Sequence, residues 1–217
     1  MPRVSILMSV YNGEKTLQES LNSIYRQSYT DWELIIINDC STDNSPDILS
    51  SAKAIFYNIK IITNSQNIGL TKSLNKGLLH CSGEYVARID ADDSWNKDKL
   101  KKQVAFLDRN DTYGLVATNS FVIDIKGVNR SYNELDLESD SQLKSAMIKF
   151  NPFVHSSVLF NRRIVEELGG YDESYKYAQD YNLWARMMAY CKFYKISEKL
   201  TYIRESRTSI SSLNYRH

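Results

Sequence analysis

The sequence has little of what marks several protein classes. Its three cysteines, Cys40, Cys81 and Cys191, are too few and too widely spaced for a zinc site or a disulfide framework, and they suggest a reducing compartment. No apolar run approaches the roughly 20 residues of a transmembrane helix, and no signal-peptide pattern opens the chain. We therefore expect a cytoplasmic protein, with peripheral association at the inner face of the membrane left open.

Strong charge and phosphate-binding motifs are also lacking. The 27 basic residues nearly balance the 26 acidic ones, so no overall field attracts nucleic acid. The segment Tyr11–Lys15, after the first expected strand, has no Gly-x-Gly-x-x-Gly pattern, and the chain has no Walker A sequence. A dinucleotide-binding Rossmann site and a P-loop are therefore disfavoured.

The first ninety residues instead alternate between short apolar runs and amphipathic segments. This alternation is typical of βαβ units on a mostly parallel sheet flanked by helices, whose strand ends meet at one edge. We expect strands at 4–10, 34–37, 59–63 and 85–90, and helices at 17–27, 45–55 and 70–78.

The second half is less regular, and residues 124–141 read as a polar excursion. We see no internal repeat and no linker, so we expect one domain with two lobes. The expected helices are 100–107, 143–150, 164–168 and 180–190, the expected strands are 115–118, 121–123, 157–160, 193–196 and 200–203, and residues 171–177 form an aromatic loop.

Three carboxylates crowd the end of the fourth expected strand, at Asp90, Asp92 and Asp93. Carboxylates this close repel one another unless a cation intervenes, and Mg²⁺ or Mn²⁺ shared with a diphosphate suits oxygen ligands. An acidic turn that caps the next helix is the alternative, and it is the commoner outcome for such a motif in isolation.

The motifs taken together resemble one family. The chain is similar to inverting glycosyltransferases of family 2, nucleotide-diphosphosugar transferases with the GT-A fold. That resemblance implies a Rossmann-like mixed sheet with a smaller acceptor-side lobe, a nucleotide-sugar-binding half at 1–93 and an acceptor-binding half with the catalytic base at 94–217. The motifs that carry it are Val4–Ile6, Tyr11–Asn12, Asn38–Asp43, Asn67–Leu70, Gly83–Asp93, Gly169–Asp172 and Gln179–Trp184.

The resemblance implies a nucleotide site at the first strand ends. Asp39 matches the aspartate that accepts a hydrogen bond from uracil, and Tyr11 matches the aromatic residue that packs on the base, with Ser9 nearby. Asn67 and Lys72 lie where they could approach the phosphates. Alternatively, Asp39 is a strand-end cap, Tyr11 a core aromatic and Lys72 a solvated lysine.

Within the acidic cluster, the resemblance assigns Asp92 to the metal and Asp90 to the ribose or to a metal-bound water. Asp180 matches the catalytic base, which takes the proton of the acceptor hydroxyl as that oxygen attacks the sugar. Alternatively, Asp180 only complements a helix dipole. Relatives often have Glu-Asp where this chain has Gln179-Asp180, which leaves the orienting role of that glutamate in doubt.

Two further positions are less clear. Arg204 matches an arginine that contacts the diphosphate, but Ser206 stands where relatives often have a histidine. His155 lies where relatives also have histidine, and it either contacts substrate or is a hydrogen-bonded structural residue.

The expected function is therefore metal-dependent, inverting transfer of a hexose or N-acetylhexosamine from a UDP-sugar to a hydroxyl of a glycan or lipid-linked acceptor, in surface polysaccharide synthesis. The cofactor implied is Mn²⁺ or Mg²⁺. Two alternatives stay open at this point: a sugar-nucleotide nucleotidyltransferase, although the glycine-rich loop of that class is missing, and a non-catalytic protein that binds nucleotide-sugars. The sequence does not identify the acceptor.

Overall fold

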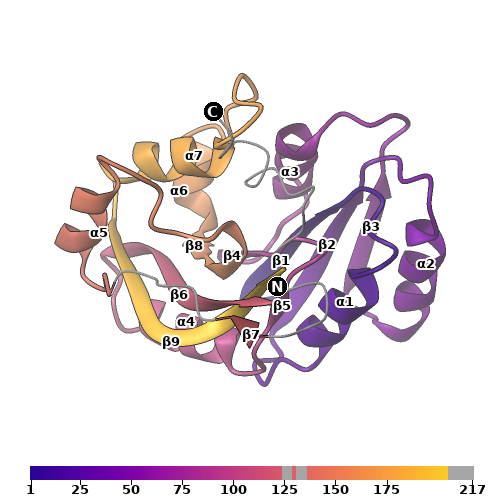
Figure 1. Ribbon diagram of the computed structural model, residues 1–217, viewed down its shortest axis with the longest axis horizontal. Helices are drawn as coiled ribbons and strands as arrows, with labels where there is room; N and C mark the ends of the chain where they lie inside the picture. The colour runs from indigo at the N-terminus through magenta and orange to yellow at the C-terminus, as the bar shows by residue number, and fades with distance from the viewer. Residues whose placement is uncertain (124–128, 131–135, 205–217) are drawn as a thin grey trace.

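The structure, a computed structural model, describes residues 1–123, 129–130 and 136–204. Strands and helices alternate through its first half, and the helices cover both faces of the sheet that the strands form (Figure 1). In chain order the elements are β1 (Val4–Val10), α1 (Leu17–Tyr25), β2 (Trp32–Asn38), α2 (Ser45–Ile55), β3 (Ile59–Thr63), α3 (Leu70–Leu78), β4 (Tyr85–Arg88), β5 (Ser94–Trp95), α4 (Lys99–Leu107), β6 (Tyr113–Ile123), β7 (Asn129–Arg130), α5 (Asp140–Ala146), the 3₁₀ turn η1 (His155–Ser157), β8 (Leu159–Asn161), α6 (Arg162–Glu167), α7 (Gln179–Met187) and β9 (Lys192–Arg204).

The strands of the described residues form one mixed sheet in the order β3-β2-β1-β4-β8-β6-β9-β5, with β7 paired to β6. The first four strands in this order are parallel, so their carboxyl ends share one edge. β8 then runs antiparallel to β4 and brings the chain back against it. The fold class and the placing of the polar strand ends at one edge are as the sequence predicted.

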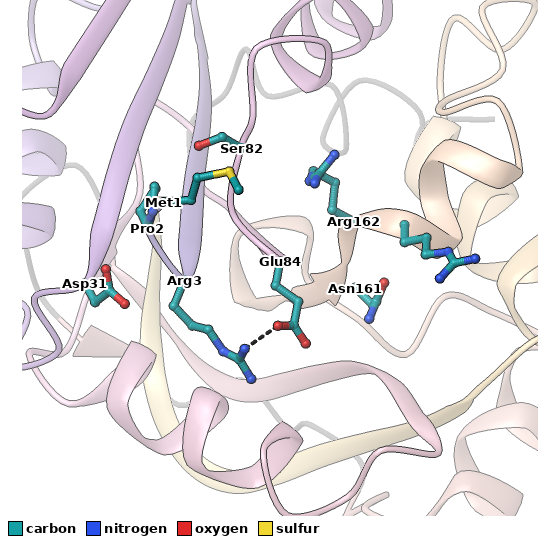
Figure 2. Close-up of a pocket in the computed structure, with 9 residues that line it drawn as sticks. Met1, Pro2, Arg3, Asp31, Ser82, Glu84, Asn161 and Arg162 are labelled. Carbon is teal, nitrogen blue, oxygen red and sulfur yellow. Dashed lines mark hydrogen bonds and ion pairs between the residues drawn. The ribbon is translucent and has the colours of Figure 1, made fainter.

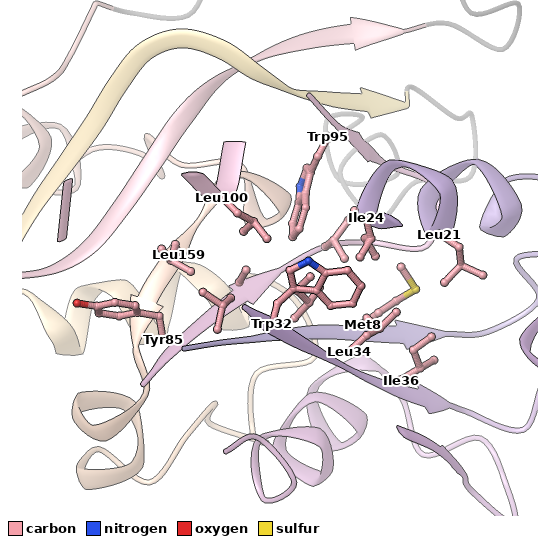
Figure 3. Packing of buried hydrophobic residues seen from close by; sticks show 14 of the residues in the cluster. Met8, Leu21, Ile24, Trp32, Leu34, Ile36, Tyr85, Trp95, Leu100 and Leu159 are labelled. Carbon is pink, nitrogen blue, oxygen red and sulfur yellow. The ribbon is translucent and has the colours of Figure 1, made fainter. Parts of the chain in front are cut away.

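Alternating side chains of the central strands build a core on each face of the sheet. Along β1, Ile6 and Met8 face the cluster that contains α1, α2 and α4, whereas Leu7 between them faces the cluster of α3, α5, α6 and α7. Figure 3 shows Met8, Leu34 and Ile36 packed beneath Leu21 and Ile24 of α1. The strands are apolar on both faces because helices cover both faces.

The second half corrects several predicted boundaries. The two strands expected at 115–118 and 121–123 are one strand, β6, and the two expected at 193–196 and 200–203 are the long curved strand β9 beside it (Figure 1). The predicted excursion at 124–141 already contains β7 and the start of α5; residues 124–128 and 131–135 within it lie outside the described residues. Helix α5 ends at Ala146, before the predicted Phe150. β4 ends at Arg88, so Asp90 lies beyond its strand.

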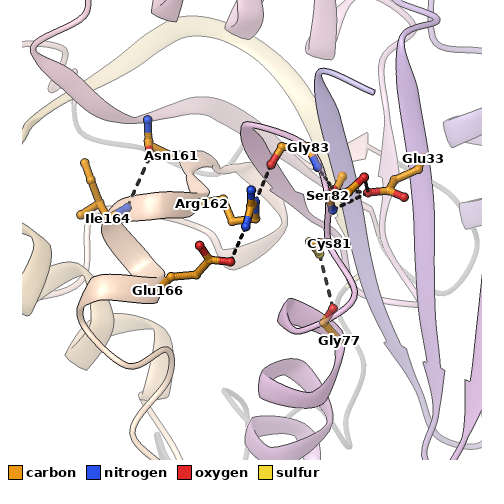
Figure 4. A network of polar contacts seen from close by, with 10 residues as sticks. Glu33, Gly77, Cys81, Ser82, Gly83, Asn161, Arg162, Ile164 and Glu166 are labelled. Atoms are coloured by element: carbon orange, nitrogen blue, oxygen red, sulfur yellow. Dashed lines mark hydrogen bonds and ion pairs between the residues drawn. The ribbon is translucent and has the colours of Figure 1, made fainter. Parts of the chain in front are cut away.

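A polar network holds the entry to β4 against β1 and α6 (Figure 4). The Glu33 carboxylate accepts hydrogen bonds from Ser5 and from the main chain and hydroxyl of Ser82, at 2.6–2.8 Å. The N–H of Gly83 donates to the Ser5 hydroxyl at 2.9 Å, and its carbonyl accepts from Arg162 Nε at 2.6 Å. A Cβ on Gly83 would lie 2.6 Å from the Ser5 nitrogen, a main-chain atom that cannot move aside.

We therefore expect Gly83→Ala to lower the free energy of unfolding by about 1–3 kcal/mol through overpacking. Gly13→Ala is the matched control, because a Cβ there meets only ordinary contacts of 3.5 Å or more and no positive φ is needed. Urea unfolding followed by circular dichroism measures both. Equal midpoints for the two variants would contradict this account of the β1–β4 contact.

Candidate active site

The carboxylate Asp90 is held by two buried neighbours just beyond β4. The Arg88 guanidinium is fully buried and lies 2.5 Å from Asp90 Oδ1. The buried Ser156 hydroxyl accepts from the Asp90 N–H at 2.9 Å and donates to Asp90 Oδ2 at 3.2 Å. Burial would raise the pKa of Asp90, but the charge of Arg88 and these hydrogen bonds hold it below its usual value. Asp90 is therefore an ionised and oriented carboxylate.

Asp92 has the opposite environment. Burial and the neighbouring charge of Asp90 raise its pKa to about 6. Apart from the main chain of Asp92 itself, no described residue donates a hydrogen bond to this carboxyl. A repelled carboxylate without a partner suits a divalent cation, so the residues fit the metal that the sequence implies. Among the described residues no three His, Cys, Asp or Glu side chains gather around one point.

Arg204, the last residue of β9, contacts the acidic cluster through Asp93. The Arg204 N–H donates to Asp93 Oδ1 at 3.0 Å, and burial raises the pKa of Asp93 well above its usual value. The Arg204 guanidinium contacts Glu19 at 2.5 Å and the main-chain oxygen of Asp92 at 3.3 Å. Arg204 thus lies beside the metal candidate, although its charge is engaged by Glu19. Ser206 lies outside the described residues.

Asp39, at the end of β2, anchors the segment that precedes α3. Its Oδ1 accepts from Asn64 Nδ2 at 2.8 Å and from the Ile68 N–H at 2.9 Å, and its Oδ2 accepts from the Gly69 N–H at 2.8 Å. The side chain is buried. The strand-end cap is therefore present, and Oδ2, with a single donor, keeps capacity for one more hydrogen bond.

The other predicted nucleotide residues lie around this edge with different exposure. Tyr11 is 52% exposed beyond β1, so it is not a core aromatic, and Ser9 is partly exposed next to Ile37 in the β1–β2 register. Asn67 accepts from the Gly69 N–H at 3.1 Å. Lys72 is exposed. Lys76, one turn further along α3 and not singled out from the sequence, donates to Asn64 at 2.7 Å.

Asp180 lies in the first turn of α7, after Ala178 in the left-handed conformation at φ 57°. Asn151 Nδ2 donates to its Oδ2 at 2.8 Å. Burial raises the pKa of Asp180, and the charge of Asp90 adds to this, while the bonds from Asn151 and from the main chain lower it. Asn151, which holds Asp180, lies five residues before Ser156, which holds Asp90, so one short segment contacts both carboxylates. Gln179 is buried.

His155 is a hydrogen-bonded residue of η1 rather than a free ligand. Its Nε2 lies 2.9 Å from the Tyr171 hydroxyl. Burial and the charge of Arg88 lower its pKa to about 3, so the ring is neutral. Sequence reasoning missed Arg88, Asn151 and Ser156 as supports of the carboxylates. The one visible signal was Arg88, a charge inside an apolar run.

A separate cavity of about 560 Å³ lies at the opposite, amino-terminal edge of the sheet (Figure 2). Arg3 pairs there with Glu84 and Asp108, and Arg162 pairs with Glu166. Its arginines are thus neutralised by neighbours, and the cavity shares none of the carboxylates described above.

Comparison with known proteins identifies the family of this chain. A model described as "Glycosyl transferase family 2" matches residues 5–169. The chain belongs to glycosyl transferase family 2. It is 37% identical over 208 residues to the "Putative glycosyltransferase EpsE" of Bacillus subtilis, covering 94% of this chain and 73% of EpsE. It is 31% identical to the "Amylovoran biosynthesis glycosyltransferase AmsE" of Erwinia amylovora, covering 85% of this chain and 69% of AmsE.

Two solved structures of this GT-A fold resemble it at low identity. S. aureus TarS 1-349 in complex with UDP-GlcNAc matches 95% of this chain with a TM-score of 0.78 at 22% identity. The mannosyltransferase PcManGT of Pyrobaculum calidifontis, in complex with GDP-Man and Mn²⁺, matches 99% with a TM-score of 0.72 at 22% identity. The chain spans 60% of each of those two chains. Within the part of the chain that the structure describes, none of the helices has the length and apolar character needed to cross a bilayer.

Ser156→Ala tests the support of Asp90. It leaves the Asp90 N–H without its acceptor, and such a loss costs about 1–3 kcal/mol for a buried group. We expect a fall of that size in the free energy of unfolding, measured with urea. Ser28→Ala is the control, because Ser28 is exposed and, among the described residues, its hydroxyl donates only to Asp98; it should change stability by less than about 0.5 kcal/mol. A Ser156→Ala protein as stable as that control would show that Ser156 does not hold Asp90.

Proposed function

We propose that this protein is a metal-dependent, inverting glycosyltransferase that moves a hexose or N-acetylhexosamine from a UDP-sugar to an acceptor hydroxyl. The observation that carries the proposal is that one segment, 151–156, holds Asp180 through Asn151 and Asp90 through Ser156. Asp180 lies on α7 and Asp90 beyond the end of β4, and the charge of Asp90 acts on both Asp180 and Asp92. A base carboxylate facing a donor-binding carboxylate pair is the arrangement that single-displacement transfer requires.

Asp180 is the general base in this proposal. Its raised pKa brings it closer to the basicity needed to accept a hydroxyl proton, and the Asn151 amide keeps Oδ2 oriented. The acceptor oxygen attacks the anomeric carbon from the face opposite the leaving diphosphate, so the configuration inverts. The proton that leaves the acceptor passes to the Asp180 carboxylate.

Asp92 holds Mn²⁺ or Mg²⁺ in this proposal, and Asp90 binds the ribose or a metal-bound water. When bound, the cation supplies Lewis-acid stabilisation of the diphosphate charge. The contrast between the two carboxylates supports the division: Asp90 is hydrogen-bonded to Arg88, whereas Arg88 and Arg204 act on the Asp92 carboxyl through their charge alone. Arg204 and Lys72 add positive charge to the phosphate side.

The nucleotide site comprises Asp39, Tyr11, Ser9 and Asn67 in this proposal. The spare acceptor capacity of Asp39 Oδ2 suits the imide N–H of uracil, and the exposed Tyr11 ring offers a face for the base. TarS, whose structure contains UDP-GlcNAc, supports a UDP-sugar donor. The name of AmsE refers to amylovoran biosynthesis, which supports a role in surface polysaccharide synthesis. We propose a glycan or lipid-linked acceptor, met in the cytoplasm or at the inner face of the membrane.

Asp180→Asn should lower kcat for transfer by about 10²–10⁴-fold, because the amide cannot accept the proton. UDP affinity, measured by calorimetry, should stay within about twofold. A screen of UDP- and GDP-sugars with Mn²⁺ supplies the donor. Asp47→Asn is the matched control, since Asp47 is an exposed acid in the first turn of α2. Undiminished transfer by Asp180→Asn would refute the mechanism.

In wild type, kcat/KM should fall with decreasing pH with a midpoint above the usual aspartate value of about 3.9.

Asp92→Ala should abolish the Mn²⁺-dependent part of UDP binding, because the ion loses its protein carboxylate. Calorimetric titration of UDP with and without Mn²⁺ measures this directly. The control is Asp98→Ala, because Asp98 is a partly exposed carboxylate just before α4. If the Asp92→Ala protein kept the full effect of Mn²⁺ on UDP affinity, the metal assignment would fail.

A further inference from the structure

Tyr171 contacts both α3 and η1, and the turn just before it contacts α7. It follows Gly169 and Gly170, which turn the chain at the end of α6 with φ of 79° and 77°. Its side chain is buried, and its hydroxyl lies 2.9 Å from His155 Nε2. Packing alone needs only the ring, which phenylalanine would supply. A buried hydroxyl costs free energy unless it is paired, and the neutral His155 ring supplies that pairing.

The main chain of Tyr171 is gripped from α3. Asn75 Oδ1 accepts the Tyr171 N–H at 2.8 Å, and Asn75 Nδ2 donates to the Tyr171 carbonyl at 2.8 Å. The same amide reaches Glu173 at 3.0 Å, so one side chain holds the start of the 171–177 loop. A Cβ on Gly170 would lie 2.7 Å from Asn75 Oδ1, so the turn is pressed closely against α3.

The same turn is fixed to α7, the helix that carries Asp180. Arg186 donates to the carbonyls of Leu168 at 2.9 Å and Gly170 at 2.6 Å. Trp184 of α7 lies edge-on to the His155 ring, with centroids 6.1 Å apart. Tyr171 and α7 therefore contact the same histidine.

His155 is also next in the chain to Ser156, the residue that contacts Asp90. The next residue, Ser156, holds both the N–H and Oδ2 of Asp90. The Ser156 carbonyl accepts from Trp95 Nε1 at 2.8 Å, which fixes η1 from the side of β5. The Tyr171 hydroxyl is thus connected through His155 and Ser156 to Asp90, and the charges of Asp90 and Asp180 both act on it.

We propose that Tyr171 is a positioning residue of the transfer reaction: its hydroxyl, through His155, holds η1 and thereby Asp90 in register with the helix that carries Asp180. The inference rests on the proposed function of Asp180 and Asp90 and assigns a role that those carboxylates do not themselves supply. Tyr171 touches neither substrate nor metal in this proposal. It sets the separation of the two groups that do, and a misplacement of about 1 Å costs up to ~10²-fold in rate.

Tyr171→Phe removes only the oxygen. We expect kcat for transfer to fall by about 10–100-fold, with KM for the UDP-sugar and UDP affinity within about twofold of wild type. Amide hydrogen exchange in the first turn of α7, residues 179–183, should become faster, because the helix loses part of its support. Tyr85→Phe is the matched control: Tyr85 is a buried tyrosine whose hydroxyl contacts Asp108 at 3.4 Å, at the other end of β4.

His155→Leu removes the other half of the contact and gives a second route should Tyr171→Phe fold poorly. If the two partners act only through their shared hydrogen bond, the double variant Tyr171→Phe/His155→Leu has nearly the same kcat as the single variant with the lower kcat. Multiplicative losses would overturn the proposal. So would a Tyr171→Phe protein with wild-type kcat, or one with reduced kcat and unchanged exchange in α7. Retained transfer by Asp180→Asn would instead defeat the proposed function, and the exchange measurement would still decide the structural link.

Discussion

The ion pair between Arg88 and Asp90 is the interaction on which the site depends. Three carboxylates lie within four residues after β4, and Arg88 beneath them is fully buried. Its Nε and Nη1 have no partner among the described residues, so the buried cation carries a desolvation cost. That cost is offset by the negative charge above it. Arg88 lowers the pKa of Asp90, whereas the charge of Asp90 raises the pKa values of both Asp92, the proposed metal ligand, and Asp93.

The antiparallel return of β8 brings the rest of the site to this carboxylate. Since β8 pairs with β4, the turn η1 just before it lies beside the end of β4, and Ser156 reaches Asp90 across 66 positions of the chain. The segment that leads into η1 carries Asn151, which orients Asp180. One short segment, 151–156, therefore supports both Asp90 and Asp180, the proposed base, and a displacement of this segment would disturb both carboxylates.

Local pattern was enough for the first half of the fold and not for the second. β1, β2 and β4 are mostly buried and apolar, and β3 contains three isoleucines, so their runs are visible in the sequence. β6 was predicted as two strands because Asn119 and Ser120 interrupt its apolar residues. In the structure the Asn119 amide donates to the carbonyl of Ser197, and the Thr118 and Thr201 hydroxyls hydrogen-bond to each other, in the shifted β6–β9 register. Likewise the density of aspartates drew attention to Asp90 and Asp92, and Arg88 lies two residues from Asp90, whereas Ser156 and Arg204, which hold the cluster from other elements, are distant in sequence.

The two interpretations of Asp39, strand-end cap and base reader, are compatible. Three N–H donors occupy its carboxylate, and they fix residues 68 and 69 at the entry to α3. The remaining acceptor capacity of Oδ2 is then aimed by the same bonds that hold the helix. α3 in turn carries Asn75, which grips the turn before α7. The segment that enters α3 is thus held by the proposed base-reading residue, and Asn75 of α3 holds the turn to which Arg186 of α7, the helix of the proposed catalytic base, also donates.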